Sequence, residues 1–273
     1  MKRNLLLCAV ATVAIASAQA QVPANAIAGK FSVAADKQVY FSKGNLQYTQ
    51  STKTWAFAEH QYDMIGDANV NGSTLADKID LFGWSGSTAT AKWGISTSTV
   101  QNDYSGDFVD WGKNIGDGNT WYTLTIDEWN YLRYNRTDAR DLAGVARIAL
   151  NADGTEYANG LILLPDNWTC SAGVTFKSGF SDTYSVQAYA DYQTLTLADW
   201  QKLEAAGAVF LPASGSRGGS LVSNVRYDGY YWSATPYDSD LAYEFRFYSN
   251  EAYTNYYWYR GYGRAVRLVQ DLD

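Results

Sequence analysis

Histidine and cysteine are almost absent from this sequence, and their scarcity removes the side chains on which most catalytic and metal sites depend. The chain of 273 residues contains one histidine, His60, and two cysteines, Cys8 and Cys170. Histidine is the usual general base and metal ligand. His60 directly follows a predicted strand, so we interpret it as a structural hydrogen-bonding residue. No G-x-S-x-G turn identifies a nucleophilic serine. We therefore predict a protein that is not an enzyme and that needs no metal or cofactor.

The few cysteines also limit covalent crosslinking. Residues 1–20 combine two cations, a short apolar run and a small-x-small cleavage motif, which is the pattern of an export signal. We expect this signal peptide to be removed and the protein to be secreted through the Sec route, to the periplasm or the cell surface. Cys8 leaves with the signal. Cys170 then has no partner for an intramolecular disulfide, and we interpret it as an inert packed thiol.

Positive charge is scarce as well. The chain has 21 Lys and Arg against 28 Asp and Glu, and residues 1–20 hold two of the cations and none of the acids, so the expected mature chain has a net charge of about −9. Nucleic-acid binders need a basic face, and so do proteins that dock on anionic lipid. We expect neither partner, and no membrane insertion after signal cleavage. No Gly-, Pro- or Ser-rich linker divides residues 21–273, which we predict to form a single domain.

Local patterns predict an α+β fold. A β-hairpin is expected over residues 38–58, and residues 62–120 are predicted to form long ordered loops that tryptophans anchor. Thr125 and Thr196 each precede an acid three residues later, followed directly by Trp129 or Trp200; this predicts two capped helices with buried indoles. The further expected strands are residues 161–165, 209–212, 243–248 and 265–269.

Acidic residues leave two alternatives open. Calcium could be held by some of Asp63, Asp67, Asp166, Asp238 and Asp240, but they fit no EF-hand spacing, and Asp also serves local hydrogen bonding in turns. Glycoside hydrolysis needs only two carboxylates, which can be distant in the chain. No pattern in the sequence selects such a pair.

Tyrosine is concentrated near the C-terminal end. Of the 22 tyrosines, 11 lie between Tyr227 and Tyr262, where even spacing would put about three. The residues between them are mostly Asp, Asn, Ser, Glu, Arg and Gly, and this composition resembles that of antibody binding loops. Good β propensity is the alternative explanation, and it suits Tyr231, Trp232 and Tyr243. The run Asn255–Tyr259 does not alternate, and burying all its hydroxyls with partners would be difficult. We interpret it as an exposed interaction site.

Five segments resemble a known family when they are taken in order. They are Tyr40–Tyr48, Leu161–Trp168, Val209–Ala213, Tyr231–Thr235 and Gly263–Val269. Together they resemble the Fibrobacter-type major paralogous domain, and the resemblance covers roughly residues 30 to 269. It implies a C-type-lectin-like fold, related to that of the formylglycine-generating enzyme, with two short helices, a small antiparallel sheet and long ordered loops.

The resemblance extends to the variable proteins of diversity-generating retroelements, whose C-terminal segment is mutagenised at template adenines. Substituted AAC or AAT codons yield chiefly Tyr, Asn, Asp, Ser and His, and the residues after Trp232 fit that spectrum except for the absence of His. The activity of the formylglycine-generating enzyme does not follow, because that family uses a cysteine pair. The calcium-dependent sugar-binding signatures of true lectins are also missing.

We therefore expect an adhesin- or receptor-like protein that binds a protein or a surface glycan through its C-terminal segment. Within that segment, Glu244, Arg246 and Tyr248 are predicted to face away from an inward row of Tyr243, Phe245 and Phe247. The predicted ligand-binding residues are Tyr237, Asp238, Asp240, Glu244, Arg246, Tyr248, Asn250, Glu251, Tyr253, Asn255, Tyr256, Tyr257, Tyr259 and Tyr262. Two alternatives remain: a glycan-acting hydrolase, and a structural or fimbrial-tip subunit.

Overall fold

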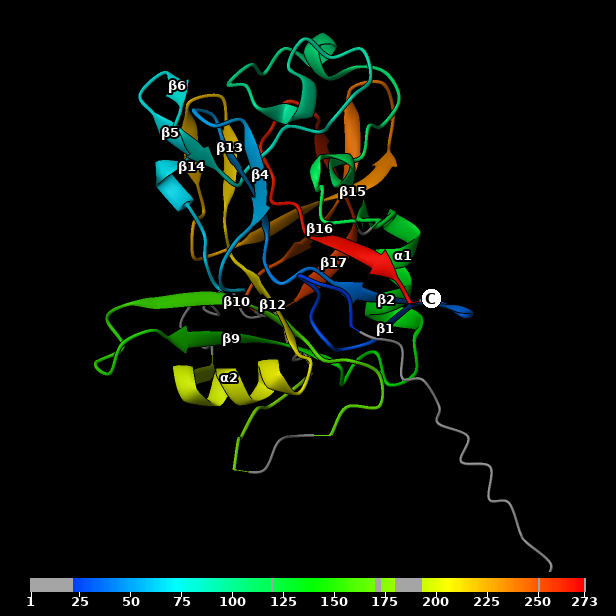
Figure 1. Cartoon of the computed structure of the whole chain (residues 1–273), viewed down its shortest axis with the longest axis vertical. Coiled ribbons are helices and arrows are strands. Elements are labelled where there is room, and N and C mark those ends of the chain that lie inside the picture. The colour runs from blue at the N-terminus through cyan, green and yellow to red at the C-terminus, as the bar shows by residue number, and fades with distance from the viewer. Residues whose placement is uncertain (1–21, 119, 170–172, 180–192, 250, 273) are drawn as a thin grey trace, which may run out of the picture.

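The computed structural model describes residues 22–118, 120–169, 173–179, 193–249 and 251–272. The predicted signal peptide, Cys170 and Asn250 lie outside the described residues. The fold is of mixed α/β type, with most of its described elements in small sheets and two short α-helices among them (Figure 1). The part of the chain that the structure describes includes no helix long and apolar enough to cross a membrane. The two predicted helices are confirmed, but several sheets replace the single small sheet that we expected.

One sheet joins the two ends of the described chain. Its strands, in spatial order, are β1 (Phe31–Ala34), β2 (Lys37–Phe41), β18 (Leu268–Asp271) and β8 (Tyr122–Thr123). All neighbours in it are antiparallel, and Val269 of β18 pairs with Phe41 of β2. Both residues are fully buried in one apolar cluster, so this pairing closes the core as well as the sheet.

A second sheet carries helix α2 (Leu197–Ala205) on one face (Figure 1). Its strands, in spatial order, are β11 (Gln193–Thr196), β9 (Ala143–Ala149), β10 (Tyr157–Leu163) and β12 (Val209–Pro212). Thr196 caps α2 by accepting the backbone N–H of Asp199, which supplies one of the partners that a helix start lacks. Trp200 lies fully buried against Phe210 of β12. The predicted burial of Trp200 is confirmed.

A third sheet holds most of the tyrosine-rich segment. It consists of β15 (Gly229–Pro236), β16 (Leu241–Phe247) and β17 (Ala252–Tyr259), antiparallel and in that order. Helix α1 (Ile126–Asn130) packs on one of its faces and continues into a π-helical turn, Tyr131–Asn135. Thr125 and Glu128 form a complete capping box, and the Trp129 indole stacks on Phe245 with ring centroids 4.5 Å apart. The helix therefore fixes one face of the sheet.

The predicted hairpin over residues 38–58 is only partly correct. Strands β3 (Leu46–Thr49) and β4 (Thr54–Phe57) do form a hairpin, and β7 (Lys78–Ile79) pairs with β3 on its other side. Strand β2, however, belongs to the sheet that joins the chain ends. Residues 42–45 separate β2 from β3, and a Cβ added at Gly44 would lie 2.6 Å from the Ala58 carbonyl oxygen. The chain therefore changes sheets at a position where only glycine fits.

The remaining described elements are short. Two hairpins are formed by β5 (Val70–Asn71) with β6 (Thr74–Leu75) and by β13 (Ser216–Gly218) with β14 (Leu221–Ser223). The 3₁₀ turns are η1 (Gly66–Asn69), η2 (Lys92–Gly94), η3 (Gln101–Tyr104) and η4 (Trp111–Asn114). Trp84 and Trp111 are fully buried within these loops. This agrees with the prediction of loops anchored by tryptophan.

The closing strand lies further along the chain than the alternation predicted. Residues 265–269 were expected as the strand, whereas β18 covers Leu268–Asp271. Ala265 and Val269 pack in one apolar cluster, and Val266 and Leu268 pack in another. The segment thus runs between two cores, so both of its faces are apolar and hydrophobic alternation cannot mark its strand boundaries.

Candidate ligand-binding surface

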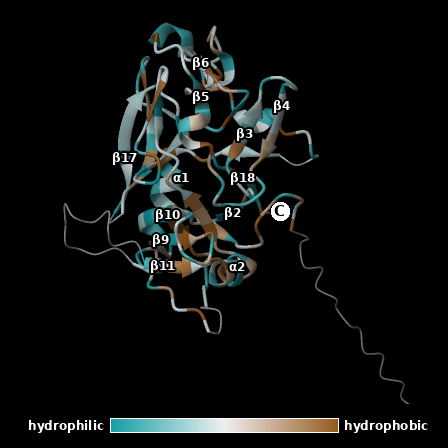
Figure 2. Cartoon of the chain, turned by 90° about the vertical axis from the view of Figure 1, so that its left-hand side faces the viewer, coloured by the Kyte–Doolittle hydropathy of each residue, from teal (hydrophilic) through white to brown (hydrophobic). Residues whose placement is uncertain are grey.

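Strand β17 is an edge strand that lies at the margin of the molecule (Figure 2). Its first three residues contribute to the interior, because Ala252 and Thr254 are buried and Thr254 donates a hydrogen bond to Asn130 of the α1 helix. Every residue from Asn255 to Tyr259 is then exposed. The exposed fractions are 38% for Tyr256, 40% for Tyr257, 41% for Trp258 and 48% for Tyr259. Four consecutive large aromatic side chains therefore face solvent.

Cross-strand pairing divides these aromatic residues between the two faces of the sheet. Tyr257 lies opposite Tyr243, and residues directly opposite each other share a face. Tyr237, which is 45% exposed, stacks on Tyr257 with ring centroids 3.8 Å apart, and its ring meets that of Tyr243 edge-on at 5.3 Å. These three rings form a first cluster on the face that carries Phe245. Tyr243 was predicted to point inward, but it is only half-buried, although Phe245 on the same face is buried under Trp129.

A second cluster surrounds Arg246 on the other face. The guanidinium carbon of Arg246 lies 4.3 Å from the ring centroid of Tyr248, 4.8 Å from that of Tyr230 and 5.2 Å from that of Tyr256. Tyr253 pairs with Arg246 across the strands and meets the rings of Tyr248 and Tyr256 edge-on. Such contacts hold a cation against aromatic faces. The predicted residues Arg246, Tyr248, Tyr253 and Tyr256 are thus brought together.

A third group lies at the C-terminal end of β17. The rings of Trp258, Tyr259 and Tyr262 lie within 6.4 Å of one another, measured between centroids. We call the three groups together the tyrosine surface: Tyr237, Tyr243, Arg246, Tyr248, Tyr253, Tyr256, Tyr257, Trp258, Tyr259 and Tyr262. It wraps around the exposed edge of the sheet and is not confined to one face.

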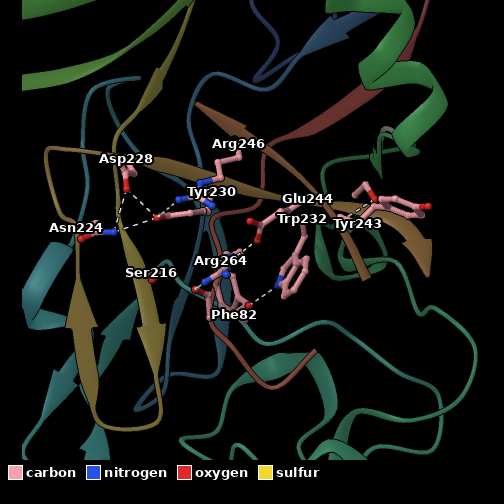
Figure 3. Close-up of polar contacts among 12 residues, drawn as sticks. Phe82, Ser216, Asn224, Asp228, Tyr230, Trp232, Tyr243, Glu244, Arg246 and Arg264 are labelled. Atoms are coloured by element: carbon pink, nitrogen blue, oxygen red, sulfur yellow. Dashed lines mark hydrogen bonds and ion pairs between the residues drawn. The ribbon is translucent and has the colours of Figure 1, made fainter. Parts of the chain in front are cut away.

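Glu244 was predicted to belong to the binding face, and that prediction is wrong. Its side chain is 1% exposed and forms an ion pair with Arg264, which is 3% exposed (Figure 3). The cause is a non-local contact: Ala265 donates its N–H to Tyr230, and its carbonyl accepts the N–H of Trp232. The segment around Ala265 therefore pairs with the edge of β15, and this brings the Arg264 side chain against Glu244.

The acids of the β15–β16 turn serve local structure. One carboxylate oxygen of Asp238 accepts the backbone N–H groups of Asp240 and Leu241, both at 2.8 Å. Arg260 donates to the Asp238 carbonyl, and its own N–H donates to the Asp240 carbonyl. Both acids are exposed, but their hydrogen bonds are those of a turn. No three His, Cys, Asp or Glu residues of the described part are grouped so that they could hold a metal ion.

Two tyrosines of this surface, and Tyr230 beside it, have a pKa above the ordinary value. Burial raises the pKa of Tyr230 to about 12, with the Asp228 carboxylate adding to the effect, and burial also raises the pKa of Tyr248. A hydrogen bond with Tyr257 raises the pKa of Tyr237. Glu251 accepts a hydrogen bond of 2.6 Å from the Tyr253 hydroxyl. The surface thus offers hydroxyl donors and acceptors beside broad ring faces, with Arg246 as its cation.

Two residues of the surface were missed in the sequence. Trp258 was not named among the ligand-binding residues, although the run in which it stands was predicted to be exposed, and Tyr243 was placed in the inward row with Phe245. The signal for Trp258 was present, since it stands within the non-alternating run Asn255–Tyr259. For Tyr243 we find no sequence signal, because it alternates with Phe245 and Phe247 as a buried residue would.

One domain family matches the chain: a domain of unknown function (DUF8237) matches residues 186–269. This range contains all the predicted ligand-binding residues, from Tyr237 to Tyr262, and covers less than half of the chain. None of the curated proteins and none of the solved structures compared with the chain matches it.

Proposed function

We propose that this chain is an exported binding protein that recognises a protein or a surface glycan through its tyrosine surface and has no catalytic role. One observation carries the proposal: Tyr256, Tyr257, Trp258 and Tyr259 are all exposed on an edge strand. Soluble proteins rarely expose large contiguous apolar patches, and those that they do expose mark interaction sites. Tyrosine also provides contact area at a small cost in side-chain entropy.

The support beneath this surface suits recognition. Trp129 stacks on Phe245 on one face of the β15–β17 sheet, and the buried Glu244–Arg264 pair lies on the other face. The side chains that would meet a ligand therefore stand on a backbone that is already ordered, and less ordering free energy is lost on binding. Ring stacking and hydroxyl hydrogen bonds need no cofactor.

The proposal includes the C-type-lectin-like fold that the sequence resemblance implies. Two short helices, sheets of three or four strands and long loops are in keeping with it. It also includes diversification by a retroelement, since the surface residues lie after Trp232, where the residue types fit adenine mutagenesis. A near-identical template repeat beside a reverse transcriptase gene, found by sequencing the surrounding DNA, would test this part. Export would be tested by the N-terminal sequence of the protein recovered from outside the cytoplasm, for which we expect Gln21 first.

Binding is tested with labelled protein on arrays of glycans and of purified surface proteins. We expect the wild type to bind some of the array members and the triple variant Y256S/Y257S/Y259S to lose that binding. A few aromatic hot spots, each worth about 2 kcal/mol or more, usually dominate an interface. The melting temperature should change little, because these rings are already exposed.

A matched control is Leu221→Ser. Leu221 is 75% exposed on β14, outside the tyrosine surface, so its loss removes exposed apolar area without touching the proposed site. If the triple variant still binds, or if its melting temperature falls strongly, these tyrosines serve the structure and not ligand binding. Turnover of an arrayed glycan would favour the hydrolase alternative.

A further inference from the structure

A cavity of about 570 Å³ lies outside the tyrosine surface, on the face of the β9–β10 sheet opposite α2. The η1 turn and the turn between β14 and β15 complete its wall. Its lining includes Gly66, Arg147, Tyr157, Asn159, Arg226 and Tyr227. Cavities of 300 to 1,000 Å³ are the usual size for small-ligand sites, so this one can hold a molecule as large as a sugar.

Sheet register builds the floor of the cavity. Arg147 of β9 lies opposite Asn159 of β10, and its Nε donates a 3.0 Å hydrogen bond to the Asn159 side-chain oxygen. The Asn159 amide nitrogen donates to the backbone carbonyl of Arg226 at 2.8 Å. Asn159 is only 4% exposed. One buried amide thus connects the two arginines that line the cavity.

The two guanidinium groups lie close to the same ring. Their central carbons are 4.2 Å (Arg147) and 5.1 Å (Arg226) from the centroid of Tyr157. Within the described residues, neither guanidinium forms an ion pair with a carboxylate. The acid in the lining is Asp67, which is exposed. In a chain whose acids outnumber its cations, this cavity therefore keeps two positive charges against one negative charge.

Arg226 reaches the cavity from a left-handed backbone position. Its φ is +67°, a conformation that L side chains other than Asn and Asp rarely adopt. Two hydrogen bonds hold it there: its N–H donates to the Ala213 carbonyl at 2.7 Å, and its carbonyl accepts from Asn159. The turn would be less strained with glycine, which would bring no guanidinium to the cavity.

We propose that this cavity binds the oxyanion of a small acidic sugar, a carboxylate or a phosphate. Arginine presents N–H groups in a planar fork that matches either oxyanion. The Nη groups of Arg147 and the whole guanidinium of Arg226 make no hydrogen bond within the described residues, while the Arg147 Nε fixes the orientation of its fork. Tyr227, which is 54% exposed, stands at the rim of the cavity. The site shares no residue with the tyrosine surface and does not depend on its function.

Isothermal titration calorimetry on the mature chain tests the proposal with three probes: glucuronate, glucose 6-phosphate and glucose. We expect one or both acids to bind, more weakly at higher salt, and glucose not to bind. The variant R226Q should weaken acid binding by about tenfold or more, the scale of a lost charge-assisted hydrogen bond. D67N should tighten it, because a like charge is removed from the lining. Binding of glucuronate but not of glucose 6-phosphate identifies a carboxylate site, and the reverse identifies a phosphate site.

The control is K113Q, which removes one cation from an exposed position outside the cavity and leaves the same net charge as R226Q. Its affinity should equal that of the wild type. R226G keeps the turn and relieves the left-handed strain, so it should melt no lower than the wild type and still lose acid binding. The proposal is overturned if glucose binds as well as the acids, if neither acid binds, or if R226Q and R226G bind like K113Q.

Discussion

Four arginines of the C-terminal segment are buried, and they organise its backbone. Arg217 and Arg267 donate mainly to carbonyl groups and to a glutamine, and burial lowers the pKa of each to about 10, so both stay protonated at neutral pH. Arg260 lies over Trp84, with its guanidinium carbon 4.2 Å from the ring centroid. Among the described residues, Arg264 is the one of these four that pairs with a carboxylate.

The Glu244–Arg264 pair gives the first prediction at the residue scale. We expect Glu244→Ala to lower the free energy of unfolding by about 3–5 kcal/mol, because it leaves a buried guanidinium without its counter-charge. Urea denaturation of the wild type and the variant measures the difference. The double variant E244L/R264M should recover much of the loss, since it leaves no buried charge unpaired. A loss below about 1 kcal/mol for E244A would mean that the pair is solvated, as surface ion pairs are.

The exposure of a side chain can be predicted from its sequence neighbours only where no distant segment covers it. The non-alternating run Asn255–Tyr259 was predicted to be exposed, and it is. Glu244 was placed outward because it alternates with Phe245, which is sound for a strand with one free face. Its face is covered by residues some 20 positions away, and no local pattern contains that contact.

Capped helices are the elements that the sequence predicted best. Thr125 with Glu128 and Thr196 with Asp199 make the expected contacts within four residues, so the information is local. The burial of Trp129 and Trp200 follows from their places on those helices and is confirmed. The assignment of β2 and β3 to different sheets was not predicted. It depends on which distant strand each one pairs with, namely β18 for β2 and β7 for β3.

The loop before β7 is organised around a buried carboxylate, Asp80. Its side chain accepts hydrogen bonds of 2.9 Å from the Ile65 N–H and from the Asn69 amide, and Asn69 accepts the N–H groups of Asp80 and Leu81 in return. Asp80 is fully buried, and burial raises its pKa to about 6 despite these hydrogen bonds. The loop thus owes its order to a polar network, whereas the buried Trp84 and Trp111 belong to the loops that follow β7.

Asp80 gives a prediction at the element scale. Its pKa is raised from 3.8 in the unfolded chain to about 6, so the folded state holds the proton more tightly. The contribution of Asp80 to the unfolding free energy should therefore fall as pH rises from about 4 to 6. At neutral pH this contribution is up to about 3 kcal/mol less favourable than in acid. Denaturation of the wild type and of D80N at pH 4, 5, 6 and 7 isolates this contribution, since the amide does not titrate. The unfolding free energy of the wild type should rise relative to that of D80N as the pH is lowered. Parallel curves would show that the Asp80 pKa is not raised.

At the scale of the whole molecule, strand β18 joins parts that are far apart in the chain. It lies between β2 and β8, and the segment leading into it separates two apolar clusters. The same segment also contacts the sheet that carries the tyrosine surface, since Arg264 pairs with Glu244 of β16. The positions of the binding surface and of the closing strand are therefore coupled through residues 264–269.

The last prediction concerns this closing strand. A chain that ends at Arg267 should fail to fold cooperatively, because β2 and β8 lose the strand between them and the fully buried Leu268 and Val269 are missing. Burying each of these side chains contributes about 1.5–3 kcal/mol. Together with the lost strand pairing, this is a large share of a typical stability of about 5–15 kcal/mol. Near-ultraviolet circular dichroism and a thermal melt measure the effect.

A chain that ends at Asp271 is the matched control for this truncation. It keeps β18 complete and loses, among the described contacts, the hydrogen bond from the Leu272 N–H to the Gln38 carbonyl. We expect it to melt cooperatively within a few degrees of the full chain, since one exposed terminal hydrogen bond contributes about 1 kcal/mol or less. If the chain ending at Arg267 melts like this control, strand β18 does not close the fold. The coupling between the core and the tyrosine surface would then have to rest on the Glu244–Arg264 pair alone.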